Sequence, residues 1–312
     1  MVVTRALTER DLPEAQRIIR NAFGTFLGAP NLENSWFPPY AHTRFGAEHI
    51  ASFAAEQDGT LAGSNFATNW GSIGFFGPLT TRPDLWDAGI GQRLVAAACD
   101  VFEGWGIRHA GLFTFAQSAK HVGLYGKFGF YPRFLTAIMA MPAQPSGAAG
   151  QWSRYSDLPD SQRTDAATAT RELADTLYDG LDLRAEIRTV FARKLGDTVL
   201  LWDGDSRLAG FAICHFGPES EAGPGSCFIK FGAVRPGPGT EDRFIALLDA
   251  CAALAVSTGM STLVAGVNTA REEAYRAMLG RGFRTQIQGV TMHRPNEPGY
   301  SRPGLFVLDD WR

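Results

Sequence analysis

The stretch RPDLWDAGIGQRL, residues 82–94, determines how the rest of the chain is interpreted. It lies between an apolar, strand-like run over 73–81 and an amphipathic, helix-like run over 90–105. Gly89 and Gly91 stand where this helix is expected to begin. Glycines at a helix start expose backbone N–H groups at the positive end of the helix dipole, and without Cβ atoms they let a phosphate come close. The stretch therefore indicates either an anion-binding turn or a purely structural tight turn. It is not the dinucleotide-binding fingerprint, because the third glycine is absent.

Outward from this turn, the first half of the chain alternates strand-like and helix-like segments. Apolar runs typical of strands cover 2–7, 50–57, 61–70, 73–81, 110–115 and 135–141, and helical periodicity covers about 8–23, 90–105 and 118–128. A Pro/Gly/Asn-rich stretch over 24–40 is typical of a loop, and Asp58-Gly59-Thr60 is a hairpin signal. This alternation predicts an α/β fold with a mixed sheet covered by helices.

The second half repeats the order of the first at a spacing of roughly 150 residues. Arg-Pro follows the central strand in both halves, at 82–83 and 235–236, and Gly-Phe ends the last helix, at 129–130 and 282–283. Between the halves, PAQPSGAAG is small, uncharged and rich in turn residues, as in a linker. We therefore expect two tandem domains, at 1–141 and 152–312, joined by a linker at 142–151.

Composition narrows the classes of function. The 312 residues suit two domains, and the net charge of −3 with no long Lys/Arg run argues against a nucleic-acid partner. No apolar run is long enough to span a bilayer and no secretory signal is visible, so we expect no membrane partner.

Cys99, Cys214, Cys227 and Cys251 form no CxxC pair and have apolar neighbours, which indicates buried thiols rather than a disulfide framework or a zinc site. We expect no metal site and a reducing, cytoplasmic location.

The first half resembles the GCN5-related N-acetyltransferase (GNAT) family in the order of its elements and motifs. That order is a strand, Arg-Pro, a short loop, Gly-x-Gly, a long helix, a strand, a helix and then YGKFGF at 125–130. In that family the coenzyme-binding motif is Gln/Arg-x-x-Gly-x-Gly/Ala, and a later Tyr-x-x-x-Gly-Phe ends the helix beside the thioester. The resemblance covers about residues 2–141. It implies two tandem acyl-CoA N-acyltransferase domains, each a mixed, mostly antiparallel splayed sheet flanked by helices.

The resemblance also implies acetyl-CoA as cosubstrate, with its pantetheine arm on the strand at 79–81 and its diphosphate on the amides of 86–91. The coenzyme-binding residues expected on this basis are Leu79, Thr80, Thr81, Trp86, Asp87, Ala88, Gly89, Ile90, Gly91, Gln92 and Ser118. Trp86 stands where the family usually has Gln or Arg, Asp87 places a negative charge beside the diphosphate, and Ala88 replaces a frequent basic residue.

Acyl transfer to an amine needs an acid for the departing thiolate, a base for the ammonium proton and donors for the tetrahedral oxyanion. By resemblance, Tyr125 is the proton donor to the thiolate, and an N–H of the strand at 79–81 is the oxyanion donor. The sequence does not identify the general base. It is either a chain of water molecules, as in many relatives, or one of five side chains: Glu33, His42, Glu48, Glu56 and His121.

The second half departs further from the family pattern. Pro238 has no N–H to offer, and Glu241 and Asp242 would repel a diphosphate at the helix start. Met278 takes the tyrosine position, although Asn268 and Tyr275 match family residues that contact the coenzyme. We expect a degenerate half with a structural or acceptor-shaping role.

The sequence thus predicts an N-acetyltransferase, an acyltransferase that moves an acetyl group from acetyl-CoA to an amine of a small molecule or peptide. Attack is expected to be direct, within a ternary complex, because no Cys or Ser sits in a nucleophile motif. The alternative is a non-catalytic acyl-CoA sensor or interaction module. An aminoacyl-transferase that uses charged tRNA is disfavoured by the acidic balance of the chain. A monomer and a homodimer are both compatible with the sequence.

Overall fold

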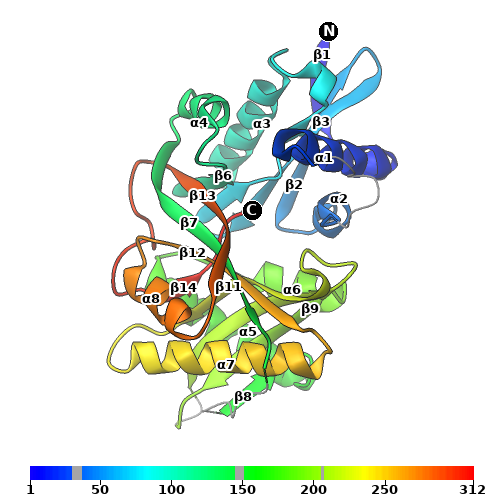
Figure 1. Cartoon of the computed structure of the whole chain (residues 1–312). Helices are drawn as coiled ribbons and strands as arrows, with labels where there is room; N and C mark the ends of the chain where they lie inside the picture. Colours follow the sequence, from blue (N-terminus) through cyan, green and yellow to red (C-terminus); the bar gives the residue numbers. More distant parts are fainter. Residues whose placement is uncertain (30–36, 145–150, 205–206) are drawn as a thin grey trace.

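A computed structural model describes residues 1–29, 37–144, 151–204 and 207–312 (Figure 1). The strands of the first half are β1 (Val2–Ala6), β2 (Ile50–Gln57), β3 (Thr60–Trp70), β4 (Ile73–Phe76), β5 (Thr80–Thr81), β6 (His109–Thr114) and β7 (Tyr131–Pro142). Its helices are α1 (Leu12–Leu27), α2 (Tyr40–Arg44), α3 (Ile90–Gly104) and α4 (Ala119–Gly126). The expected strand over 73–81 is divided into β4 and β5. Helix α1 extends into the expected loop over 24–40, and α2 begins at the last residue of that loop.

The second half has the same alternation. Its strands are β8 (Gln151–Arg154), β9 (Gly196–Trp202), β10 (Leu208–Gly217), β11 (Gly223–Val234), β12 (Thr262–Asn268), β13 (Arg284–Arg294) and β14 (Val307–Leu308). Its helices are α5 (Asp160–Leu177), α6 (Arg184–Ala192), α7 (Thr240–Ser257) and α8 (Glu272–Gly280). Each half contributes strands to a mixed sheet and helices that flank it, so the predicted α/β fold class is confirmed.

In the first half, α1 and α3 cover opposite faces of the sheet. Ala54 and Phe66 pack in a cluster with the buried face of α1, whereas the next residues along each strand, Ala55 and Ala67, pack in clusters with α3. Successive strand residues point to opposite faces, so this alternation places one helix on each side.

One exchange of strands joins the two halves, and the sequence did not predict it. Strand β13 of the second half lies between β6 and β7 of the first, and β7 lies between β13 and β12. Figure 1 shows β7 and β13 crossing in the middle of the molecule. The strands of the described chain therefore form one continuous sheet rather than two.

The halves also share a hydrophobic core. Trp70 and Phe75 of the first half pack with Phe231 and Trp311 of the second, and the ring centroids of Trp70 and Phe231 are 5.5 Å apart. The Trp311 ring covers Gly111 on β6 so closely that it leaves no room there for a Cβ atom. Burial of such large rings contributes several kcal/mol to stability, and neither half can bury them alone.

A chain of buried charges runs through the same boundary. Glu221, between β10 and β11, accepts hydrogen bonds from Arg44 Nε at 2.9 Å and from Lys230 Nζ at 3.3 Å. Lys230 Nζ lies 3.0 Å from Glu186 on α6, which also bonds His49 at 3.0 Å. Charges this deeply buried persist only when they are paired, so the network fixes α2 against the second half.

Arg44 extends this network toward the break between β4 and β5. Its Nη1 donates to the Gly77 carbonyl, and its Nη2 donates to the Arg312 carbonyl at 2.6 Å. The break in the strand is thus held by a side chain that the second half fixes in place.

Within the described ranges, none of the helices is both long and apolar enough to cross a membrane. The same residues contain no group of three or more His, Cys, Asp or Glu side chains arranged to hold a metal ion.

The exchanged strands predict that the first half does not fold alone. Residues 1–142 expressed without the rest lose β13 from beside β6 and lose the shared core, so we expect no cooperative thermal transition by circular dichroism. The same fragment co-expressed with residues 151–312 is expected to co-purify as a folded complex. A cooperative transition of the isolated fragment near the melting temperature of the whole chain would contradict the exchange.

The buried charges predict a pH-dependent stability. Burial raises the pKa of Glu221, but Arg44 and Lys230 outweigh it and hold the pKa well below its ordinary value. A depressed pKa stabilises the folded chain above the ordinary carboxyl value of about 4.3, and this stability is lost as the pH falls below it. Glu221→Gln should lower the free energy of unfolding at pH 7 by about 3–5 kcal/mol, because Arg44 and Lys230 lose a buried partner.

Urea unfolding between pH 7 and pH 3 checks this expectation, with the difference from wild type shrinking as the pH falls. The control is Glu48→Gln, which removes an exposed partner of Arg188 and should cost less than about 1 kcal/mol. An effect of Glu221→Gln as small as that of the control would show that the network contributes little.

Candidate functional site

The site begins where β4 stops following β6. Strand β4 runs parallel to β6 as far as Phe75, which lies opposite Gly111. Gly77, with φ of 154°, and Pro78 then interrupt the strand. Beyond the interruption β5 pairs with β3, and in the described chain its other edge has no strand partner. Strands β5 and β6 therefore diverge and leave an open backbone edge between them.

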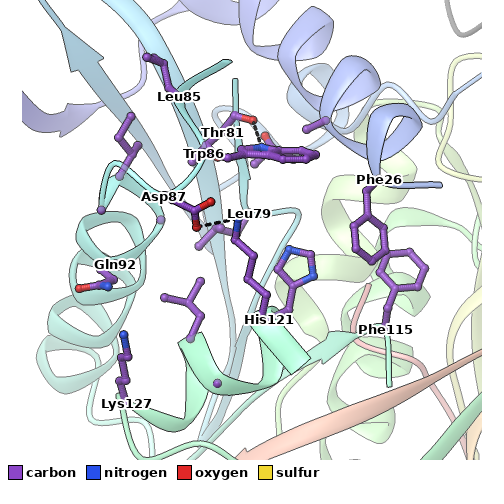
Figure 2. A pocket seen from close by; sticks show the side chains of 18 of the residues that line it. Phe26, Leu79, Thr81, Leu85, Trp86, Asp87, Gln92, Phe115, His121 and Lys127 are labelled. Carbon is purple, nitrogen blue, oxygen red and sulfur yellow. Dashed lines mark hydrogen bonds and ion pairs between the residues drawn. The ribbon is translucent and has the colours of Figure 1, made fainter. Parts of the chain in front are cut away.

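A cavity of about 430 Å³ lies at this divergence (Figure 2). Its walls come from α1, the approach to β5, the loop before α3, the first turn of α3, the end of β6 and α4. The lining residues are Ala22, Phe23, Phe26, Leu79, Thr80, Thr81, Leu85, Trp86, Asp87, Gly89, Ile90, Gly91, Gln92, Phe115, Ala119, Lys120, His121, Gly123, Leu124 and Lys127. Thr80 Oγ1 is buried here without a hydrogen-bond partner.

The first turn of α3 forms one wall. Gly89 caps the helix in the left-handed conformation with φ of 77°, and the first turn carries no acidic side chain. A Cβ atom at Gly91 would lie 3.5 Å from Leu124 Cδ2 and 3.7 Å from Leu79 Cδ2, so this position faces the cavity between β5 and α4. The first N–H groups of a helix have no intrahelical partner, and here they lie at the cavity wall.

The loop before α3 is tied across the cavity mouth. Trp86 Nε1 donates to the Thr81 carbonyl at 3.2 Å, and Lys120 Nζ on α4 lies 2.8 Å from Asp87 Oδ1 (Figure 2). Lys120 Nζ also lies 5.4 Å from the centre of the Trp86 ring. Both partners of the ion pair are more than half exposed, so the pair is weak and a competing ligand can replace it.

Most of the residues expected to bind the coenzyme line this one cavity. They are Leu79, Thr80, Thr81, Trp86, Asp87, Gly89, Ile90, Gly91 and Gln92. Ala88 and Ser118 are not among the lining residues. Ala88 is exposed on the loop, and Ser118 is the N-cap of α4, where its hydroxyl accepts a hydrogen bond from the His121 N–H at 3.4 Å.

Tyr125 does not line the cavity. Its ring packs in the core, 5.7 Å from the ring of Phe76, and burial raises the pKa of its hydroxyl. Helix α4 turns Tyr125 toward the sheet, whereas Lys120, His121 and Leu124 of the same helix face the cavity.

Of the candidate bases, the structure brings His121 to the cavity. Burial, and then the charge of Lys120, lower the pKa of His121 and favour its neutral form. Glu48 and Glu56 are paired elsewhere, with Arg188 and Arg5. His42 is exposed on α2 and does not line the cavity, and Glu33 lies outside the described residues.

Several lining residues were not identified from the sequence. They belong to segments far apart in the chain: Phe23 and Phe26 of α1, Phe115 after β6, Lys120 of α4 and Lys127, which follows α4 as its C-cap. The spacing of 120, 124 and 127 matches one face of a helix, and this signal could have identified the two lysines. The approach of α1 to β6 depends on tertiary packing and gives no such local signal.

The second half fills the equivalent position with its own tail. Strand β14 pairs with the end of β11, Leu308 opposite Gly232 and Val307 opposite Ala233. Ala233 corresponds to Thr80 when the two Arg-Pro pairs are aligned. Both residues of β14 are fully buried. The strand edge that is open in the first half is therefore closed in the second.

The family-like residues of the second half serve its packing. Asn268 is buried and donates to Thr291 Oγ1 at 2.6 Å, and Met278 lies in the core. Glu241 and Asp242 occupy the first turn of α7, where acidic side chains stabilise a helix start.

Residues 17–130 match the model of the acetyltransferase (GNAT) family. No match was found among curated proteins.

Solved structures with the same fold cover nearly the whole chain. A protein of Pyrococcus horikoshii assigned to the acetyltransferases is 12% identical, with a TM-score of 0.68 over 98% of this chain and 93% of that one. A GCN5-related N-acetyltransferase from Sphaerobacter thermophilus is 17% identical, with a TM-score of 0.61 over 94% and 95%. A tandem GNAT protein from the clavulanic acid biosynthesis pathway is 13% identical, with a TM-score of 0.56 over 94% and 98%.

Proposed function

We propose that the chain is a tandem member of the acetyltransferase (GNAT) family and that its first half is an N-acetyltransferase. It transfers an acetyl group from acetyl-CoA to an amine of a small molecule or peptide, by direct attack in a ternary complex. The observation that carries the proposal is the open edge of β5 beside the exposed start of α3, on one cavity.

The open edge of β5 suits the pantetheine arm. Pantetheine contains two amide groups, and a strand edge without a partner offers N–H and C=O groups to such amides. Thr80 Oγ1 is a further buried group on this wall that lacks a partner. A buried polar group without a hydrogen bond is costly, and a bound amide would satisfy it.

The start of α3 and two lysines suit the diphosphate. The N–H groups of residues 90–92 stand at the positive end of the helix dipole. Lys120 of α4 and Lys127 at its C-cap lie on the opposite wall and supply positive charge. Gln92 adds a neutral donor on the side of α3.

His121 takes the proton in this proposal. The amine nitrogen attacks the thioester carbonyl carbon, the C–N bond forms, and the C–S bond breaks with its electron pair on sulfur. His121 accepts the proton that the nitrogen loses, and the thiolate then takes a proton from His121 or from solvent. We assign Tyr125, which lies in the core, to the packing of α4 against the sheet.

The second candidate function is a non-catalytic acyl-CoA sensor. The observation that favours it is the Asp87–Lys120 pair with Trp86 at the cavity mouth, because Asp87 opposes a diphosphate there. The same coenzyme site serves both functions. Release of free CoA in the presence of an amine distinguishes them, since a sensor binds the thioester without cleaving it.

The coenzyme site predicts the effect of Gly91→Asp. The new carboxylate would enter the cavity between Leu79 and Leu124 and repel the diphosphate. By calorimetry, the wild type is expected to bind one acetyl-CoA per chain, and the variant none at millimolar coenzyme. The matched control is Gly104→Asp at the other end of α3, where a Cβ atom meets nothing within 4 Å.

If Gly91→Asp and Gly104→Asp bind acetyl-CoA equally well, the assignment of the coenzyme site to this cavity is wrong. Binding of two coenzymes per wild-type chain would contradict the closure of the second half by β14.

The Asp87–Lys120 pair predicts that Asp87→Asn binds acetyl-CoA more tightly. The substitution frees Lys120 and removes a negative charge, so we expect the Kd to fall about two- to fivefold, the scale of an exposed ion pair. Pantetheine, which lacks the diphosphate, should bind both proteins equally. Asp84→Asn removes the exposed partner of Arg82 on the same loop and serves as control. An unchanged Kd for Asp87→Asn would show that Asp87 does not oppose the coenzyme.

A further inference from the structure

We propose that the acceptor is an amine with an aromatic body, bound where α1, the end of β6 and α4 meet. The inference rests on the proposed function, because it assigns the second substrate of the same site.

Aromatic rings from three separate elements converge at this end of the cavity. The ring of Phe26 on α1 lies 4.9 Å from that of Phe115, which follows β6, and 5.0 Å from the imidazole of His121 on α4. Phe23, one turn before Phe26, lies 6.3 Å from Phe115. Figure 2 shows Phe26 and Phe115 together on one side of the view, and Gln92 and Lys127 on the other. The cavity thus has an aromatic end and a polar end.

These rings are partly exposed, although each is apolar. Phe23, Phe26, Phe115 and His121 are all neither buried nor fully exposed. A group of rings that line a cavity and keep solvent-accessible faces is typical of a binding surface rather than of a core. Because rings favour offset or edge contacts with other rings, a flat aromatic ligand complements this wall better than a small alkyl amine.

The cavity offers little negative charge to a polycationic acceptor. Among the described lining residues, Asp87 alone is a carboxylate, and it is paired with Lys120. The remaining ionisable groups of the wall are Lys120, His121 and Lys127. A polyamine or an aminoglycoside needs carboxylates for its several ammonium groups, and the residues Phe23, Phe26, Phe115 and His121 at the aromatic end offer none. An amine with a single nitrogen and an aromatic body meets no such penalty.

His121 contributes to the same wall in a second way. Its ring contacts Phe26 and also carries a nitrogen able to accept a proton. An amine whose aromatic body lies against Phe26 and Phe115 would hold its nitrogen beside His121. Neighbouring side chains then hold the aromatic part of the amine and accept the proton from its nitrogen.

The test uses the full chain saturated with CoA and measures binding of 2-phenylethylamine and of spermidine by calorimetry. We expect saturable binding of 2-phenylethylamine, and none of spermidine at the same concentration. Phe26→Ala should raise the Kd for 2-phenylethylamine about tenfold, the scale of one lost ring contact. The control is Leu27→Ala, which removes an exposed neighbour on the same helix that does not line the cavity. Its Kd should be unchanged.

Spermidine binding in place of 2-phenylethylamine, or equal affinities of Phe26→Ala and Leu27→Ala, would overturn the inference. A third arm compares acetyl-CoA with hexanoyl-CoA. If Phe26→Ala weakens hexanoyl-CoA alone, the rings hold an acyl chain, which also contradicts the proposal. Failure of the proposed function is distinguished from failure of this inference by the first titration. If the chain binds no CoA, the proposed function is wrong, and this is known before any amine is added.

Discussion

The pairing of β13 between β6 and β7 is the constraint on which the rest of the structure depends. A strand from the second half holds β6 in place on one side, while β4 holds it on the other. Strand β6 ends beside Phe115, which is a wall of the cavity. The half that contains the cavity is therefore completed by the other half. The second half therefore has a structural role whether or not it binds a ligand, since its β13, Trp311 and Glu221 support the first half.

The edge at the end of the central strand is open in the first half and paired in the second. In the first half, Gly77 and Pro78 divide the strand, and Arg44 bonds the Gly77 carbonyl, so β5 leaves β6 with an open edge. In the second half, the chain continues past β13 and returns as β14, which covers the same edge. A strand edge in a folded protein is either paired, covered or kept for a ligand. We interpret the open edge of the first half as the one kept for a ligand.

Local patterns predicted most of the helices and strands, and most of the residues expected to bind a coenzyme line one cavity. Gly89 and Gly91 lie at a helix start beside the cavity, and α1 covers most of the helical periodicity expected over about 8–23. The strand exchange was not predictable, because β7 and β13 are equivalent copies and the same apolar pattern fits either neighbour. The position of Tyr125 also depends on packing, since a shift of one helical face separates the core from the cavity. The convergence of Phe26, Phe115 and His121 joins segments almost 100 residues apart (26 and 121 differ by 95), which no local pattern reports.

The central claim is that one coenzyme site lies in the first half and that the tail closes its counterpart. A crystal structure of the full chain grown with CoA tests this most directly. The account predicts one CoA per chain, with its diphosphate at residues 89–92, its pantetheine arm along Thr80 and Thr81, and β14 still paired with β11. A CoA bound against β11 with β14 displaced, or a CoA bound away from β5 and α3, would contradict it.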